Sequence, residues 1–185
     1  GRAGGILSIP AEEVSLLKNT SEALSVVAHG LDWRSGDNVV ISDEEFPSNR
    51  IVWESLSRQG VEVRRVPLTG PDAPEQALLK RTDRRTRLLS ISSVQYGSGL
   101  RMDLHQLGAA LKQRGVLFCV DAIQSIGAEP LDVDAIQADF VAADGHKWML
   151  GPEGLALFYC RATLRDQLQL HQYGWHMVAD AGNFD

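Results

Sequence analysis

The sequence has few cysteines, no excess of basic residues and no long apolar run. Its two cysteines, Cys119 and Cys160, lie inside apolar runs without metal-ligand spacing, so we expect reduced, buried thiols and neither a disulfide framework nor a metal site. Eighteen lysines and arginines against 24 aspartates and glutamates give a net charge of −6. This balance excludes a whole-molecule basic field for nucleic acid or an anionic membrane surface, and we interpret the basic cluster at 80–87 as a solvated connection.

Several recognisable sequence patterns are also absent. No apolar run approaches the length of a membrane-spanning helix and the first residues show no signal-peptide pattern, so we expect a cytoplasmic protein. A chain that opens on "GRAGG" without methionine is expected to be cut from something longer. Neither GxGxxG nor GxxxxGK followed by Ser or Thr occurs, which removes the usual support for a Rossmann dinucleotide site and for a P-loop.

Short β-branched runs alternate with helical patterns along most of the 185 residues, a length sufficient for one large domain. This alternation predicts an α/β fold with a mostly parallel central sheet flanked by helices. Strands are predicted at 13–18, 38–42, 61–68, 86–92, 116–120, 139–143 and 155–160, and helices at 21–31, 47–60, 74–81 and 103–114.

Polar segments follow five of the predicted strands. In an open parallel sheet ligands bind at the carboxyl ends of the strands, so we expect these segments to share one small anionic, heterocyclic ligand. They read "NTSE", "DEEFPSN", "SVQYGSG", "DAIQS" and "DGHKW". In the first, Asn19 and Glu22 resemble a capping box, with the hydroxyls of Thr20 and Ser21 beside free amides. Such a helix start can hold phosphate, although helix capping alone explains the same residues.

The ordered set of Asp121-x-x-Gln124, the His146-Lys147 pair and "GPEG", placed after "NTSEA" and "EFPSN", resembles a known family. It is similar to the pyridoxal phosphate enzymes of fold type I, specifically the class V aminotransferase group. That group includes cysteine desulfurases, selenocysteine lyases, kynureninases and isopenicillin N epimerase. The resemblance implies a cofactor-binding large domain over residues 1–170, the start of a connection toward an absent C-terminal domain over 171–185, and a homodimer.

The resemblance also implies roles for individual residues around pyridoxal 5′-phosphate (PLP). Lys147 would form a Schiff base with it, which requires an unprotonated amine, and Asp121 would pair with the pyridine nitrogen so that the ring acts as an electron sink. Gln124 would donate to the phenolic oxygen of the ring, and His146 would reach the phosphate. Taken singly, a surface lysine, a helix-capping aspartate and a solvated glutamine explain three of these residues equally well.

Three further assignments follow from the same resemblance. Phe46 matches the ring that family members stack on the cofactor, although a hydrophobic staple for the helix at Pro47 is an alternative. Gln95 lies within a residue of the asparagine that they place beside the ring. Asp144 departs from the family pattern, which usually has serine there. A carboxylate repels phosphate unless it is protonated or turned toward His146 or a neighbouring amide.

The sequence thus predicts a PLP-dependent transferase or lyase that labilises a bond at the α- or β-carbon of a small amino acid. It does not specify the reaction. The alternative is a truncated, non-catalytic α/β module that retains the sheet without a complete active site. We further expect Trp148, Met149 and Leu150 to pack, and Gly151 and Gly154 to provide turn geometry.

Overall fold

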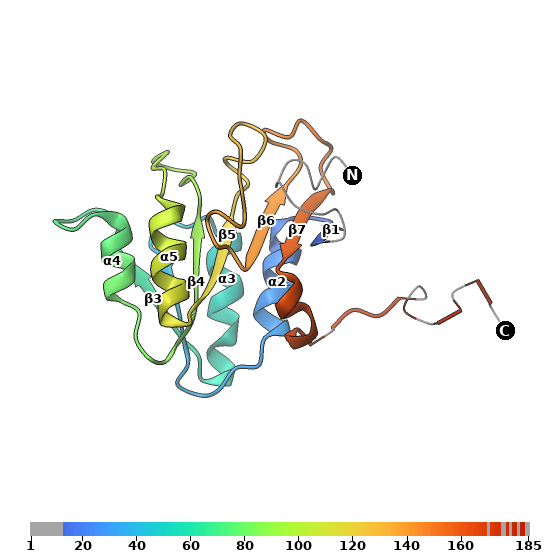
Figure 1. Cartoon of the computed structure of the whole chain (residues 1–185), viewed down its shortest axis with the longest axis horizontal. Coiled ribbons are helices and arrows are strands. Elements are labelled where there is room, and N and C mark those ends of the chain that lie inside the picture. Colours follow the sequence, from blue (N-terminus) through green and yellow to red (C-terminus); the bar gives the residue numbers. More distant parts are fainter. Residues whose placement is uncertain (1–12, 170, 175–176, 178, 181, 184–185) are drawn as a thin grey trace.

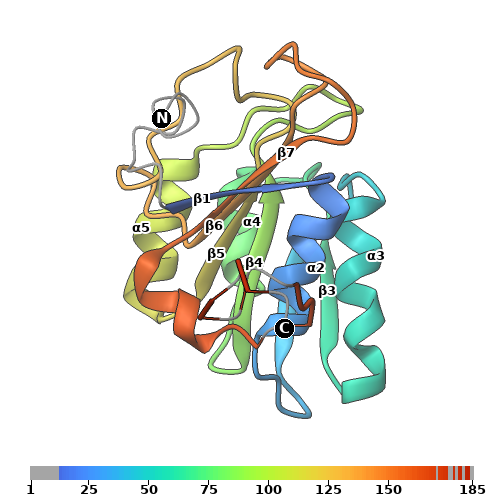
Figure 2. The same ribbon diagram turned by 90° about the vertical axis from the view of Figure 1, so that its right-hand side faces the viewer.

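The computed structural model describes residues 13–169, 171–174, 177, 179–180 and 182–183. It contains a seven-stranded sheet in the order β1-β7-β6-β5-β4-β2-β3, with helices on both faces (Figures 1 and 2). Neighbouring strands from β6 to β3 in this order run parallel, whereas β7 is antiparallel to both β6 and β1. The sheet is therefore mixed and mostly parallel, as predicted.

Every predicted strand is present and every predicted helical range contains helix, with ends shifted by a few residues and one range divided in two. The strands are β1 (Val14–Leu17), β2 (Asn38–Ser42), β3 (Glu62–Val66), β4 (Thr86–Ser92), β5 (Leu117–Asp121), β6 (Phe140–Asp144) and β7 (Ala156–Cys160). The α-helices are α2 (Thr20–Gly30), α3 (Ser48–Glu54), α4 (Pro74–Lys80) and α5 (Leu104–Arg114), and the 3-10 helices are η2 (Ser55–Gln59) and η3 (Ala162–Gln167).

The helix predicted at 47–60 is wrong as a single α-helix, because it tightens into the 3-10 helix η2 at Ser55. The Ser55 hydroxyl donates to the carbonyl of Val52 at 2.6 Å. A serine hydroxyl that bonds backward in this way competes with the regular helical ladder. The segment ends at Gly60, which has a left-handed φ of 78°. This φ explains why glycine is favoured there.

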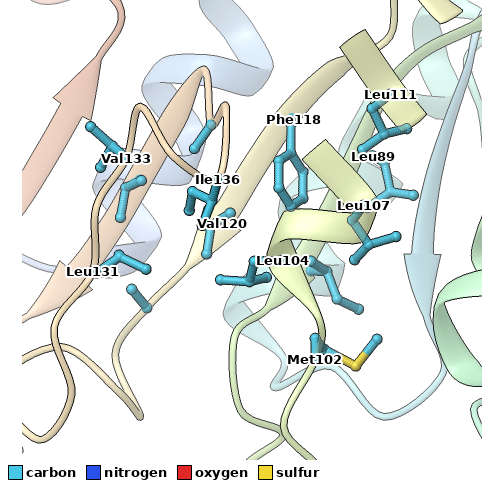
Figure 3. Close-up of a cluster of buried hydrophobic side chains, with 14 of the residues drawn as sticks. Leu89, Met102, Leu104, Leu107, Leu111, Phe118, Val120, Leu131, Val133 and Ile136 are labelled. Atoms are coloured by element: carbon cyan, nitrogen blue, oxygen red, sulfur yellow. The ribbon is translucent and has the colours of Figure 1, made fainter. Parts of the chain in front are cut away.

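Each face of the sheet buries its own apolar cluster. On one face Leu111 of α5 lies close to Leu89 of β4 and Phe118 of β5 (Figure 3). On the other face Leu88 of β4 belongs to the cluster that includes Trp53 of α3. Because successive strand residues point to opposite faces, both Leu88 and Leu89 are buried. Strands covered on both faces read as continuous apolar runs, and this accounts for the sequence pattern.

Two expectations from composition concern thiols and membrane spans. Cys119 and Cys160 are free and buried, and burial raises the pKa of both thiols, that of Cys160 to about 11. Both thiols are therefore protonated near neutral pH, in agreement with inert, packed cysteines. Among the described residues, no helix is long and apolar enough to cross a bilayer.

The strand directions bring the polar segments to one edge of the sheet. Since β1 is antiparallel to β7 and β7 is antiparallel to β6, β1 runs in the same direction as β6. The segments that follow β1, β2, β4, β5 and β6 therefore emerge at the same carboxyl edge, the upper edge in Figure 1. At this edge Asn19 caps α2 by accepting the N–H of Glu22 at 2.8 Å. The carboxylate of Glu22 accepts the N–H of Lys18 at 2.7 Å, one residue earlier than in a regular capping box.

Candidate active site

Asp121 is a buried carboxyl group at the end of β5. The strand was predicted to end at residue 120, but Asp121 is its last residue, because Asp121 still pairs with Ala142 of β6. The residue is 2% exposed, and its Oδ1 accepts the N–H of Ile123 at 3.1 Å. The pKa of Asp121 is raised to about 7, mainly by burial; the charge of Glu45 also raises it, whereas the Ile123 N–H and the charge of Lys147 lower it. A buried carboxyl with one such hydrogen bond in the described chain suits a cationic partner.

Lys147 lies just beyond β6, the strand adjacent to β5, and is half-buried. Its carbonyl accepts the N–H of Leu150 at 3.0 Å, so the lysine begins a tight turn. The positive charge of Lys147 lowers the pKa of both Asp121 and Asp144. The aspartate and the lysine that the sequence singled out thus end and follow two adjacent strands, at the same edge of the sheet.

Asp144 ties the end of β6 to the start of α2. Its Oδ1 accepts the N–H of Thr20 at 3.2 Å, and its own N–H donates to the Thr20 hydroxyl at 3.1 Å. His146 Nδ1 lies 3.9 Å from Asp144 Oδ2. Burial raises the pKa of Asp144, whereas the charge of His146 and the Thr20 N–H lower it. The carboxylate is thus turned toward an amide and His146. It accepts the hydrogen bond of the Thr20 N–H, one of the amides that were expected to bind phosphate.

Ser21 and Phe46 lie in the segments that follow β1 and β2. The Ser21 hydroxyl donates to the Ser48 hydroxyl at 2.8 Å, which links the first turns of α2 and α3. Phe46 is 46% exposed, and its ring meets that of Tyr96 edge to face, with 5.1 Å between the centroids. An exposed aromatic ring at the carboxyl edge is available for stacking on a flat ligand.

The two glutamines differ in their surroundings. Gln95 is 1% exposed and its Nε2 donates to Glu45 Oε1 at 2.8 Å, whereas its Oε1 is buried without a hydrogen-bond partner in the described chain. Gln124 is half-buried in the turn after Asp121, where the N–H of Ser125 donates to Ala122 at 3.0 Å. Gln95 is therefore turned toward Glu45, and Gln124 stays close to the end of β5.

Glu45 is a buried site-edge residue that sequence reasoning missed. It is 6% exposed, and its two carboxylate oxygens accept hydrogen bonds from three different segments. Oε1 accepts from the Ser42 hydroxyl and from Gln95 Nε2, each at 2.8 Å. Oε2 accepts from Asn49 Nδ2 at 2.7 Å and from the Ser92 hydroxyl at 2.6 Å.

The residues after Lys147 depart in part from the expectation that they pack. Met149 packs against the apolar cluster that contains Leu89 and Phe118, but Trp148 is 56% exposed and Leu150 is 90% exposed. The expectation is wrong for these two, because the described part of the chain does not cover the outer side of their turn. Gly154 has the expected left-handed φ of 83°. A Cβ on Gly151 would lie 3.1 Å from a backbone oxygen, so this glycine permits a close approach.

Gly127 supports the turn that carries Lys147. Its φ is 96°, and a Cβ there would lie 2.7 Å from the carbonyl carbon of Trp148. We expect Gly127→Ala to lower the free energy of unfolding by about 2 kcal/mol or more and to weaken PLP uptake, because it adds a backbone clash to left-handed strain.

The matched control for this substitution is Gly115→Ala, since Gly115 has a φ of 66° and no neighbour within 4 Å of its Cβ position. It carries the left-handed strain alone, about 1 kcal/mol. Urea unfolding and PLP titration of both variants measure the difference. Equal losses in the two variants would contradict the assigned contact.

The chain has the large-domain fold of PLP enzymes of fold type I, with a mixed, mostly parallel seven-stranded sheet. A buried carboxyl group ends β5, and a lysine follows the adjacent β6. The family model for aminotransferase class-V matches residues 5–183. The chain therefore belongs to the aminotransferase class-V family.

Its relatives include cysteine desulfurases. A probable cysteine desulfurase from Methanothermobacter thermautotrophicus is 36% identical over 184 residues, which are 97% of this chain and 45% of the relative. The apo structure of a cysteine desulfurase from Thermococcus onnurineus NA1 aligns with a TM-score of 0.85 at 28% identity, covering 92% of this chain and 44% of that one.

A further structural relative is C-DES, a cystine C-S lyase. Structures with glycine covalently linked to its PLP cofactor and with its product, cysteine persulfide, each align with a TM-score of 0.87 at 26% identity. The alignment covers 94% of this chain and 48% of C-DES. The chain thus spans about half the length of the relatives that it matches.

Proposed function

We propose that this chain is the cofactor-binding part of a PLP-dependent enzyme that acts on a small amino acid, with aminotransferase or cysteine desulfurase/lyase-like chemistry. The observation that carries the proposal is the position of Asp121 at the end of β5 and Lys147 just beyond the adjacent β6. The similarity to cysteine desulfurases and to a cystine C-S lyase favours a sulfur-containing substrate such as cysteine or cystine.

The residues present fit the proposed cofactor. PLP, when bound, supplies an electron sink for a bond at the substrate α-carbon. Asp121, whose pKa is raised to about 7 by burial, gains a favourable partner if it holds a proton on a ring nitrogen. Lys147 provides the amine for covalent attachment, and the exposed ring of Phe46 provides a stacking surface.

The phosphate assignment centres on the first turn of α2. Ser21 and His146 remain the assigned phosphate contacts, and Thr20 contributes through its position at the helix start, where an anion is favoured. Asp144 acts indirectly in this proposal, because its carboxylate accepts the Thr20 N–H. Gln124 is assigned to the phenolic oxygen of the ring, and Gln95 to the edge of the site.

The described residues do not offer a thiol for desulfuration. Cys119 and Cys160 lie within buried strands, and burial raises the pKa of each thiol. We assign any nucleophilic cysteine, and the group that binds the substrate carboxylate, to the part of the longer relatives that this sequence does not cover. Residues 1–170 would form the large domain, 171–185 would begin the connection to that part, and the active form would be a homodimer.

Exposed aromatic and aliphatic side chains at the carboxyl edge support such an assembly. Trp148 and Leu150 are 56% and 90% exposed. Apolar surface of this kind favours association with a covering partner.

The 185-residue polypeptide is expected to bind PLP, to turn over cysteine or alanine very slowly, and to self-associate. Cofactor contacts are local to this chain, whereas orientation of a substrate carboxylate is not. The measurements are a PLP titration followed by visible absorption, spectral change on addition of each amino acid, and sedimentation. A colourless chain would favour the non-catalytic module, and rapid turnover by a strict monomer would show that the site is complete within these residues.

A further inference from the structure

Glu45 joins three separate segments at the edge of the candidate active site. Ser42 ends β2, Asn49 lies in α3, and Ser92 ends β4. Hydrogen bonds of 2.8, 2.7 and 2.6 Å connect these side chains to the one carboxylate, and the Ser92 N–H donates to it as well. Buried hydrogen bonds to a charged acceptor are stronger than neutral ones, so this arrangement fixes the segments to each other.

Two consecutive contacts join the loop after β2 to the loop after β4. Gln95 Nε2 donates to Glu45 Oε1 at 2.8 Å, and the next residues along each loop, Tyr96 and Phe46, pack edge to face at an interplanar angle of 88°. Glu45 and Gln95 are 6% and 1% exposed, whereas Phe46 and Tyr96 are 46% and 54% exposed. A buried polar contact thus joins the two residues that immediately precede the members of an exposed aromatic pair.

We propose that Glu45 is a positioning residue that sets the orientation of the Phe46–Tyr96 pair, in which Phe46 presents its face to the cofactor ring and Tyr96 packs edge to face against Phe46. This inference rests on the proposed function. It assigns to Tyr96 the role of holding the Phe46 ring in place by an edge-to-face contact. Glu45 does not touch the cofactor and acts through the two loops that it joins.

The partners of Glu45 explain why a carboxylate is needed. The side-chain amides of Asn49 and Gln95 and the N–H of Ser92 are all turned toward it as donors. A glutamine of the same size would place a donor where one acceptor oxygen now lies. Glu45→Gln therefore removes acceptor capacity from a buried set of donors, and the two loops lose their tie.

Ser90→Ala is the matched control. The Ser90 hydroxyl donates to Asn49 Oδ1 at 2.6 Å, and Ser90 is fully buried, so this variant also removes a buried hydrogen bond from the same region. It leaves every direct partner of Glu45 in place. A general loss of stability affects both variants, whereas loss of the aromatic surface affects Glu45→Gln alone.

Two readouts test the proposal on the 185-residue chain. Without cofactor, hydrogen exchange of the backbone amides in 43–49 and 93–99 should be roughly tenfold faster in Glu45→Gln than in Ser90→Ala, the effect of losing about one charged hydrogen bond. With PLP, the visible circular dichroism of the bound chromophore should fall by about half or more in Glu45→Gln and stay unchanged in Ser90→Ala, because it reports ring orientation.

The outcomes separate this inference from the proposed function. No PLP signal in the unsubstituted chain overturns the proposed function and this assignment with it. A normal signal that is the same in Glu45→Gln overturns only the role of Glu45. If Glu45→Gln does not fold, Ser92→Ala, which removes one donor to Glu45 Oε2 at 2.6 Å, should shift both readouts in the same direction by a smaller amount. Unchanged readouts in that variant also overturn the proposal.

Discussion

Replacement of Lys147 by alanine is expected to abolish covalent attachment of PLP while the chain stays folded. The lysine is half-buried in a turn beyond β6, outside the apolar clusters on the two faces of the sheet. Its loss removes the amine and leaves the core intact, so the free energy of unfolding should change little. The measurement is the visible absorption band of the PLP-treated chain, and whether borohydride makes the label permanent.

Lys112→Ala provides the control for this prediction. Lys112 lies in the last turn of α5, which packs on one face of the sheet. It should retain the full label. If Lys147→Ala still binds PLP covalently, or if Lys112→Ala does not, the assignment of Lys147 is wrong.

Asp121→Asn is expected to stabilise the cofactor-free chain at pH 8 and to impair the loaded enzyme. Burial raises the pKa of Asp121 from 3.8 to about 7. The folded chain therefore holds a proton that the unfolded chain releases, and stability falls as pH rises from about 4 to about 7, with the full cost present above that range. Removing the carboxyl should recover about 2–4 kcal/mol, since one pKa unit corresponds to roughly 1.4 kcal/mol.

Urea unfolding of the cofactor-free chain at pH 5 and pH 8 measures this effect. The gain from Asp121→Asn should be larger at pH 8. Asp72→Asn is the control, because the Asp72 carboxylate pairs with Lys80 at the surface and should give little change at either pH. A loss of stability in Asp121→Asn at pH 8 would contradict the claim that the buried carboxylate of Asp121 destabilises the cofactor-free chain.

The same substitution should reduce turnover far more than it reduces the affinity for PLP. Both quantities are to be measured in a longer protein that contains this sequence and the part that it lacks. An amide fills the space of Asp121 but does not stabilise a protonated ring nitrogen as charge develops. Near-normal turnover would rule out the electron-sink role. The opposite signs of the two effects, stability gained and activity lost, are typical of a residue kept for function.

The order of helices and strands was predictable because tertiary packing and local pattern agree along most of this chain. The run "VLFCV" predicts a buried strand, and β5 is buried on both faces through Phe118 and Cys119. The ends of strands were less predictable. Asp121 and Asp144 were predicted to follow their strands. In the structure both belong to the strands, because Asp121 pairs with Ala142 of β6 and Asp144 pairs with Ala156 of β7. Ladder length depends on the partner strand, which local sequence does not contain.

The candidate site was predictable where its residues follow neighbouring strands, and less so where they are tied across segments. Asp121 and Lys147 lie at the same edge of the sheet because β5 and β6 are adjacent and parallel. Glu45 was missed, since its partners lie in segments that are distant in sequence. One signal was present: Ser90 and Ser92 alternate with apolar residues in β4, so both lie on one face and need polar partners there.

The central claim is that Lys147 holds the cofactor next to Asp121. The most direct measurement is peptide mapping by mass spectrometry after the PLP-loaded chain is reduced with borohydride. We expect a single pyridoxyl adduct on the peptide that contains Lys147. An adduct on Lys18, Lys80 or Lys112 in its place, with Lys147 unmodified, would contradict it.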